Sequence, residues 1–423
     1  PICTFDETYS FVYLTDAQIG ASGSWQNDRD RWAASLGQID QFEKDASMIV
    51  SGGDQIETHR SEDEYASLIA PELLKQVPFQ ATIGNHDNQS DQFNSHFFTP
   101  NRSETHGYEG IDGRAGGDYW YTYNGVLYLN INTNARSTNE EDHAAFLREV
   151  AEEQGADANW IVVVMHHSLY SAAFHSVEQD VKERRAALAP VFSELGIDLV
   201  LAGHDHIYTR SYLMDGTTPA GDLEAQEKSG VTLAAEEGQV LYVTGNSSSG
   251  SKFYGLDASS PEAAIKDQSN QPQYTDVDVT PEAITLTTYQ TMDRKVIDEV
   301  TLTRTANDEK GPEFAGLPAE SEVAQGQPFE PLAGVSATDE IDGDGPTAEM
   351  EILRGDLARL LHDAAQNHGS FRFGDHVASV AEEADAAYRH RIRRPGPGRE
   401  APRRRRRPAR ARRCGSRAAG RGS

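Results

Sequence analysis

The sequence predicts a layered α/β domain with helices outside its sheets, and three observations predict it. Short apolar runs rich in β-forming residues alternate with segments that carry apolar residues at helical spacing. Five of these runs end in residues whose side chains can bind metal ions. The third observation is that these residues stand where the runs end. The loops at the carboxyl ends of such strands face a common crevice, so the side chains from all five runs can meet there.

The first part of the predicted domain alternates strand and helix. Its elements are, in order, a strand over 11–14, a helix over 28–44, a strand over 47–50, a helix over 61–75 and a strand over 79–83. The strands are short apolar runs, and helix 28–44 has apolar residues three or four positions apart. From Tyr119 to Asn134 the residues then show the alternating pattern of two β-strands, one on each side of Asn124-Gly125. Asn-Gly is the two-residue signal of a β-hairpin turn.

The second part continues the alternation. Its predicted elements are a helix over 138–153, a strand over 160–164, a helix over 177–195, a strand over 199–201, and further strands over 239–243, 275–290 and 295–305. Residues 214–238 are acidic and are predicted to be a loop. We interpret this loop as a solvated insertion, with a lid over the site as the alternative.

Five short motifs hold the candidate ligands. They are Thr15-Asp16-Ala17-Gln18, Gly53-Asp54, Gly84-Asn85-His86-Asp87, Met165-His166-His167 and Gly203-His204-Asp205-His206. Carboxylate oxygen, amide oxygen and imidazole nitrogen are ligands of divalent Mn, Fe and Zn. A single aspartate can equally cap a helix, and a single asparagine can form a turn. Five such motifs, each at the end of an apolar run, together predict a centre with two metal ions.

These motifs resemble the signature of the calcineurin-like metallophosphoesterases over roughly residues 8–305. Gly203 to Arg210, and Met165-His166 followed by Tyr170, are most similar to the purple acid phosphatase branch. The resemblance implies a β-sandwich flanked by helices. It also implies a hydrolase, a dinuclear metal-dependent phosphoesterase that uses Mn, Fe or Zn. In that chemistry a hydroxide bridging the two ions attacks a phosphate monoester or diester.

The resemblance also gives each candidate residue a role. The implied metal ligands are Asp54, which bridges the two ions, Asp16 and His206 on one ion, and Asn85, His166 and His204 on the other. His86 would contact the phosphoryl oxygen or protonate the leaving group, and His175 is a second candidate for this work. Asp87 would orient His86 or a ligand imidazole.

Two positions depart from the family pattern. Gln18 stands where many relatives have histidine, so it is either a weak ligand or a holder of metal-bound water. Glu57 stands where the purple enzymes have a tyrosine that binds Fe(III), so their colour and ferric preference are not implied. Gln18 is also the feature that favours a second hypothesis, a surface or binding protein that keeps the fold and has lost catalysis.

Charge and composition restrict the partners. The formal net charge is −29, although 15 arginines and one acidic residue lie in 389–423, so the rest of the chain is more acidic still. Such a body repels nucleic-acid backbones and anionic surfaces, which disfavours a nuclease. The small phosphorylated substrate that we expect is implied by the resemblance. No apolar run reaches about 18 residues, so no membrane span is predicted. Two cysteines, Cys3 and Cys414, predict no disulfide framework.

We predict a catalytic domain over 1–305, a linker over 306–318, a partial segment over 319–348 and a helical, then Arg/Pro-rich, disordered tail over 349–423. The partial segment resembles the opening strands of immunoglobulin-like repeats in secreted and wall-bound bacterial enzymes. We therefore expect a secreted or wall-associated protein, although the chain begins at Pro1 with no signal peptide. The tail is either a frame-shifted read of a GC-rich gene or a basic arm for anionic partners.

Overall fold

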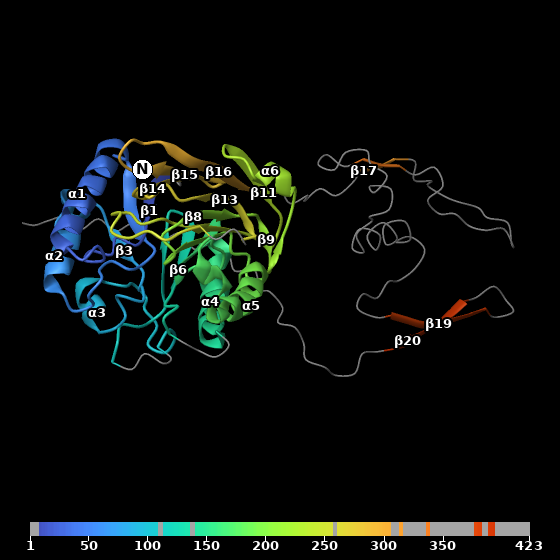
Figure 1. The fold of residues 1–423 in the computed structure, drawn as a ribbon. Helices are drawn as coiled ribbons and strands as arrows, with labels where there is room; N and C mark the ends of the chain where they lie inside the picture. Colours follow the sequence, from blue (N-terminus) through green and yellow to red (C-terminus); the bar gives the residue numbers. More distant parts are fainter. Residues whose placement is uncertain are drawn as a thin grey trace, which may run out of the picture. The chain divides into compact units, whose positions relative to one another are not determined.

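The computed structural model describes residues 8–108, 113–135, 140–256 and 260–305, together with four short strands further along the chain (Figure 1). The chain forms two compact units, Pro1–Ala306 and Asn307–Ser423. All candidate site residues lie in the first unit. The helix predicted within 349–423 lies outside the described residues.

The second unit contains two antiparallel pairs of strands among its described residues. β17 (Glu313–Ala315) pairs with β18 (Ser336–Thr338), and β19 (His376–Glu382) pairs with β20 (Tyr388–Arg393). The sequence predicted no strand in this part of the chain, and β20 reaches into the Arg-rich stretch that begins at residue 389.

The first sheet of the first unit has seven strands of mixed direction. In spatial order they are β11 (Val231–Ala235), β16 (Val296–Arg304), β15 (Ala283–Gln290), β14 (Gln273–Val279), β1 (Tyr9–Leu14), β2 (Ala46–Ser51) and β3 (Phe79–Ala81). β1, β2 and β3 run parallel, whereas β14, β15 and β16 form an antiparallel meander. β1 therefore lies between the second and the fourteenth strand of the chain.

The second sheet has nine strands. They are β10 (Thr218–Pro219), β9 (Met214–Asp215), β12 (Gln239–Thr244), β7 (Leu199–Gly203), β6 (Trp160–His167), β5 (Val126–Ile131) and β4 (Tyr119–Tyr123), with β8 (Tyr208–Ser211) paired to β12 and β13 (Ala263–Asp267) paired to β8. The middle strands run parallel, and β4 and β5 form the predicted hairpin. Asn124 and Gly125 both have positive φ, as this hairpin turn requires.

Six α-helices and three short 3-10 helices are found among the described residues. They are α1 (Trp25–Phe42), α2 (Glu62–Ile69), α3 (Gln92–His96), α4 (Glu141–Gln154), α5 (Gln179–Glu194), α6 (Leu223–Gln226), η1 (Glu72–Lys75), η2 (Gly155–Asp157) and η3 (Phe174–Val177). The single helix predicted over 61–75 is two elements, because Pro71 has no N–H to continue the hydrogen bonding of α2.

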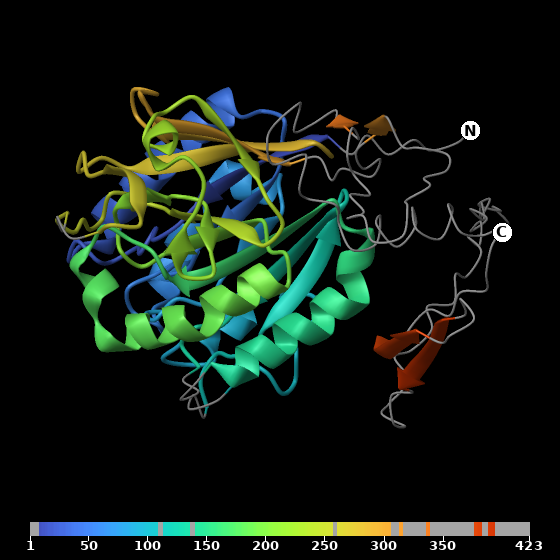
Figure 2. The same cartoon turned by 90° about the vertical axis from the view of Figure 1, so that its right-hand side faces the viewer.

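The two sheets pack face to face, and helices cover their outer faces. In β1 the side chains alternate: Phe11 and Tyr13 belong to the core between the sheets, whereas Val12 packs with Trp32 of α1 on the outside. On the second sheet, Leu188 of α5 packs in the outer core with side chains of β5, β6 and α4. Figure 2 shows α4 and α5, in green, lying along that sheet. The predicted layered β-sandwich flanked by helices is confirmed.

The acidic segment 214–238 is the main departure from the prediction. It was expected to be a loop, but it contains α6 and three strands, one of which, β11, completes the edge of the first sheet. The start of this segment lies away from the candidate ligands. Asp215 of β9 pairs with Gln239, at the start of β12, whereas the candidate ligands follow the carboxyl ends of the parallel strands.

Candidate metal centre

The candidate ligands come from the carboxyl ends of five parallel strands in both sheets. Asp16 follows β1, Asp54 follows β2, and Asn85 follows β3; His166 is the last residue but one of β6, and His204 follows β7 directly. The register of the parallel strands places these ends at one edge of the sandwich. Residues 188 positions apart are thereby in contact, since the backbone N–H of His204 donates to the Asp16 carboxylate at 3.0 Å.

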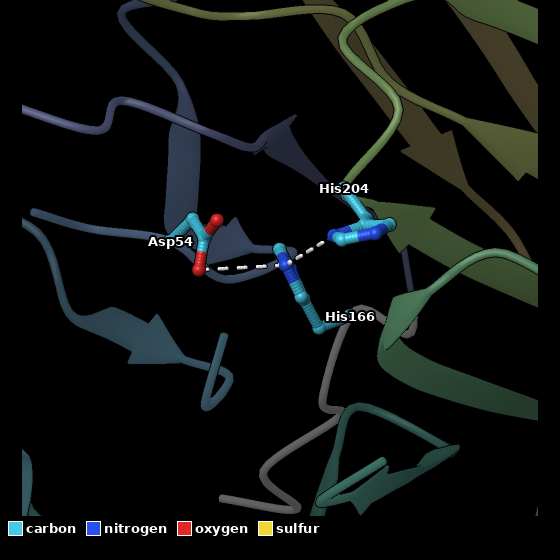
Figure 3. A group of neighbouring side chains, drawn as sticks. All are labelled: Asp54, His166 and His204. Atoms are coloured by element: carbon cyan, nitrogen blue, oxygen red, sulfur yellow. Dashed lines mark hydrogen bonds and ion pairs between the residues drawn. The ribbon is translucent and has the colours of Figure 1, made fainter. Parts of the chain in front are cut away.

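One group of four residues, Asp54, Asn85, His166 and His204, converges on a single point. Figure 3 shows three of them, Asp54, His166 and His204. The Asn85 Oδ1 atom lies 3.0 Å from His166 Nε2 and 2.9 Å from His204 Nδ1. His166 Nε2 is also 3.4 Å from Asp54 Oδ1. The ligand atoms of Asp54, His166 and His204 all lie within 4.8 Å of one another. This is the group that the family resemblance placed on one ion.

Hydrogen bonds to the backbone fix which nitrogen each imidazole presents. His166 donates its Nδ1–H to the carbonyl of Gly52 at 2.9 Å, so its Nε2 faces Asn85 and Asp54. His206 donates its Nδ1–H to the carbonyl of Lys252 at 2.9 Å, so its Nε2 faces Asp16. Bonds of this kind orient the ring and hold the tautomer that a metal ion needs.

A second group forms around Asp16. The Asp16 Oδ1 atom lies 3.3 Å from His206 Nε2, and its Oδ2 accepts from Thr15 Oγ1 at 2.7 Å. Gln18 donates its amide N–H to Glu57 Oε2 at 2.8 Å. The Gln18 Oε1 atom is buried and has no hydrogen-bond partner among the described residues. Glu57 thus leaves the Gln18 oxygen, the one atom of this side chain that can bind a cation, available.

The loop after β3 brings His86 to the same place. Its backbone N–H donates to Asp54 Oδ1 at 2.9 Å, and its Nδ1 lies 3.1 Å from the Glu57 carbonyl and 3.3 Å from Glu57 Oε2. Asp87 is fully buried, and its carboxylate accepts from the backbone N–H groups of Gln55 and Gly84. Asp87 therefore holds the two ligand loops together, rather than bonding to the His86 ring.

His175 lies on the other flank of the centre. Its ring is 4.8 Å from that of His204, and its Nδ1 is 3.0 Å from Glu178 Oε1. His175, His204 and Asp205 also bring their ligand atoms within 4.8 Å of one another. The sequence analysis gave Asp205 no role and did not predict the contacts of Glu57 with Gln18 and His86. The position of Asp205 between His204 and His206 was the signal available in the sequence.

The charges of the buried groups are strongly coupled. Burial disfavours the charged form of His166, but the adjacent Asp54 carboxylate outweighs it and raises the pKa of His166 to about 9. Burial and the neighbouring His166 hold the pKa of His204 well below its usual range. Burial and the Asp54 charge raise the pKa of Asp87 to about 7. A buried set made mostly of acceptor atoms is compatible with bound cations, whose charge offsets these costs.

Three glycines allow the ligand loops to approach one another. A Cβ atom on Gly84 would lie 2.1 Å from Asp54 Oδ1, and one on Gly203 would lie 2.6 Å from Asp16 Oδ2. A Cβ atom on Gly53, whose φ is +106°, would lie 2.5 Å from His166 Nδ1. A side chain at any of these positions would displace a candidate ligand.

Comparison with known proteins agrees with this geometry. Residues 11–208 match the family model described as calcineurin-like phosphoesterase. Purple acid phosphatase 17 of Arabidopsis thaliana is 40% identical over 53 residues, which is 12% of this chain and 15% of that protein. Uncharacterized proteins from two strains of Mycobacterium tuberculosis are 25% identical over 161 residues, 33% of this chain and 29% of theirs. The chain thus spans less than a third of the curated relatives it matches.

Among solved structures, the purple acid phosphatase PPD1 from yellow lupin (Lupinus luteus) seeds is similar with a TM-score of 0.56 at 16% identity, covering 70% of this chain and 54% of that one. This likeness shows the fold. The family match over residues 11–208 confirms the resemblance drawn from the sequence.

The residues present fit bound divalent cations. The donors are carboxylates, amide oxygens and imidazoles, which suit Mn, Fe and Zn. The unpartnered Gln18 oxygen is an acceptor that a cation would satisfy.

No helix among the described residues is long and apolar enough to span a membrane.

Proposed function

We propose that this protein is a dinuclear metal-dependent phosphoesterase that hydrolyses phosphate monoesters or diesters. The observation that carries the proposal is the convergence of Asp54, Asn85, His166 and His204, beside the Asp16–His206 pair. Two bound divalent ions would neutralise the phosphoryl oxygens and activate a water molecule for attack. Asp54, between the two groups, is proposed to bind both ions.

The chain's own residues have distinct proposed tasks. Asn85, His166 and His204 would hold one ion with Asp54, whereas Asp16, His206 and the oxygen of Gln18 would hold the other. His86 has its Nδ1 beside Glu57, so its Nε2 is the nitrogen left for the phosphoryl oxygen or the leaving group. His175, held by Glu178 in the same way, is the second candidate for proton transfer.

The proposal is tested by metal content and turnover of the same preparations. We expect about two equivalents of metal by elemental analysis, and release of nitrophenol from its mono- or bis-phosphate ester with Mn, Zn or Fe. Asp54→Asn and His204→Ala should lower turnover by about 100-fold or more and reduce metal content, because each removes a ligand. Asp40→Asn, which changes an exposed carboxylate on α1, serves as the control and should leave both values unchanged.

The alternative is a protein that keeps the fold for binding or display, as the glutamine at position 18 first suggested. Metal content separates the two. A purified protein with one equivalent or none after metal loading, and no turnover of either ester, would favour the alternative. The acidic body supports the further proposal that the protein acts outside the cell.

A further inference from the structure

A polar cavity of about 570 Å³ lies beside the metal centre. It is lined by Asn85, Asn88, Gln89, Arg114, Thr133, Asn134, His167, Asp180 and Arg184. Asn85 is a candidate ligand, and the His167 ring is 4.5 Å from that of His204, so the cavity adjoins the centre. Every one of these lining residues is polar. A leaving group that occupies such a space is hydrophilic, because an apolar one would strip water from these groups without replacing its hydrogen bonds.

Arg184 is the fixed cation of this cavity. It is only 4% exposed, its Nε donates to Glu140 Oε1 at 3.1 Å, and its Nη2 donates to the carbonyl of Thr133 at 3.2 Å. Its Nη1 is buried and has no hydrogen-bond partner among the described residues. An unpaired buried guanidinium N–H is costly, so an acceptor supplied by a ligand would be bound favourably there.

A series of buried charged side chains fixes the position of Arg184. Glu140, its partner, lies 3.6 Å from His143 Nε2, and His143 Nδ1 lies 2.7 Å from Asp118 Oδ2. All of these side chains are more than nine-tenths buried. A donor that is fixed in this way loses little conformational entropy when it binds a ligand.

The other charged groups of the cavity lie at exposed positions. Arg114 supplies a second cation, and Asp180, on α5, supplies a carboxylate. The amides of Asn88, Gln89 and Asn134 add donors and acceptors that suit hydroxyl groups. The cavity is therefore not uniformly positive, and Arg184 marks the one deep position that favours an anion.

We propose that this cavity is a leaving-group subsite that selects phosphate esters of small hydroxylated compounds carrying a second anionic group, which accepts a hydrogen bond from Arg184. A site built to bond such a group discriminates against the analogue that lacks it, because the buried donor is then left unpaired. The inference rests on the proposed phosphoesterase function, because the cavity would bind the leaving group of a substrate whose phosphoryl group is bound at the metal centre.

The test compares esters that differ only in the second anionic group. The full chain loaded with Mn²⁺ is assayed with glycerol phosphate, phosphoglycerate, glycerol bisphosphate and nitrophenyl phosphate. We expect kcat/KM for phosphoglycerate or the bisphosphate to exceed that for glycerol phosphate by about tenfold. Arg184→Gln should bring this ratio close to one. Lys182→Gln, which removes a charge from an exposed position of the same helix, should keep it.

The outcomes separate this inference from the function on which it rests. Suppose that the unaltered protein hydrolyses nitrophenyl phosphate but has the same kcat/KM for glycerol phosphate as for phosphoglycerate and the bisphosphate. This result would overturn the proposed subsite and would agree with the proposed phosphoesterase function. Hydrolysis of none of the four esters would overturn both. The unaltered protein decides the matter even if Arg184→Gln fails to fold, and Arg184→Lys, which keeps the charge, provides a second variant. The preferred ester tells whether the anionic group is a carboxylate or a phosphate.

Discussion

Five candidate ligands have a backbone conformation that L-residues seldom adopt. Asp16, Gln18, Asp54, His204 and His206 have φ values of 50°, 35°, 49°, 74° and 47°. For a residue other than glycine, this left-handed conformation raises the conformational free energy by roughly 1–3 kcal/mol, and it persists only where the surrounding structure imposes it. The strain is concentrated where the proposed metal ions would bind. Gln18 shares it with the other four, which supports its assignment as a ligand rather than as a bystander.

The pKa of His166 leads to a prediction on metal binding. In the metal-free protein its pKa is about 9, so the imidazole carries a proton at neutral pH. A metal ion must displace that proton, and the apparent association constant should therefore rise about tenfold per pH unit below pH 9. Titration calorimetry with Mn²⁺ or Zn²⁺, in buffers of different ionisation enthalpy, counts the protons released. Affinity that does not change between pH 6 and pH 8 would contradict the assignment of His166 as a ligand.

At the scale of elements, each ligand is presented by a strand that ends and a loop that turns sharply. Gly84, in the loop after β3, shows how close the fit is, because a Cβ atom there would also lie 2.2 Å from the backbone nitrogen of Asp54. Gly84→Ala should push apart the loops after β2 and β3. We expect loss of bound metal and a decrease of about 1–3 kcal/mol in the free energy of unfolding.

The matched control for that substitution is Gly37→Ala. Gly37 is exposed in the middle of α1, and a Cβ atom there would meet nothing within 4 Å. Alanine should raise the free energy of unfolding by about 0.5–1 kcal/mol, because it has the better helix propensity, and should leave metal content unchanged. Urea unfolding and elemental analysis of both variants check the pair. Equal metal content in the two variants would show that the loops tolerate a side chain.

At the scale of the whole molecule, one buried ion pair joins the two sheets. Arg210 of β8 donates to Asp298 of β16 at 2.6 Å, and the Tyr208 hydroxyl donates to the same carboxylate at 2.8 Å. Both charged side chains are completely buried. Asp298→Ala leaves the guanidinium without its counter-charge and should lower the free energy of unfolding by about 3–5 kcal/mol.

The double variant Arg210→Met/Asp298→Leu should recover most of that loss, since it removes both charges and fills their volume. Glu299→Ala, at an exposed position of the same strand, should change stability by less than about 0.5 kcal/mol. Urea unfolding of the three proteins tests the prediction. A single variant as stable as the unaltered protein would show that the pair does not hold the sheets together.

The layers of this molecule follow from local patterns, which is why the sequence predicts them well. Each strand that carries a ligand is a short apolar run, and the Asn124-Gly125 turn identifies its own hairpin. β11 escaped prediction because only Leu233 and Ala235 are buried in an otherwise acidic segment. Its pairing with β16 is a contact between distant parts of the chain, which periodicity does not show.

The sequence likewise predicts one part of the candidate site, the ligands, and not the other part, the contacts that orient them. Residue types and their spacing identify the ligands, because the chemistry of a metal ion limits the choice of side chains. The contacts that orient them could not be predicted. Glu57 beside Gln18 and His86, and Arg184 beside Glu140, join residues that are 29 to 44 positions apart in sequence. Only the folded chain specifies which of its many polar residues meet.

The place of β1 in the first sheet has a consequence for biosynthesis. β1 lies between β2, which follows it closely, and β14, which begins 264 positions after β1 begins. A ribosome must therefore complete most of the first unit before this strand gains its second neighbour, so the sheet cannot close while the chain is emerging. Pairing over such separations is slow, and the unpaired edge of β1 is exposed to other chains meanwhile. Nascent copies should depend on chaperones until residue 279 has left the exit tunnel.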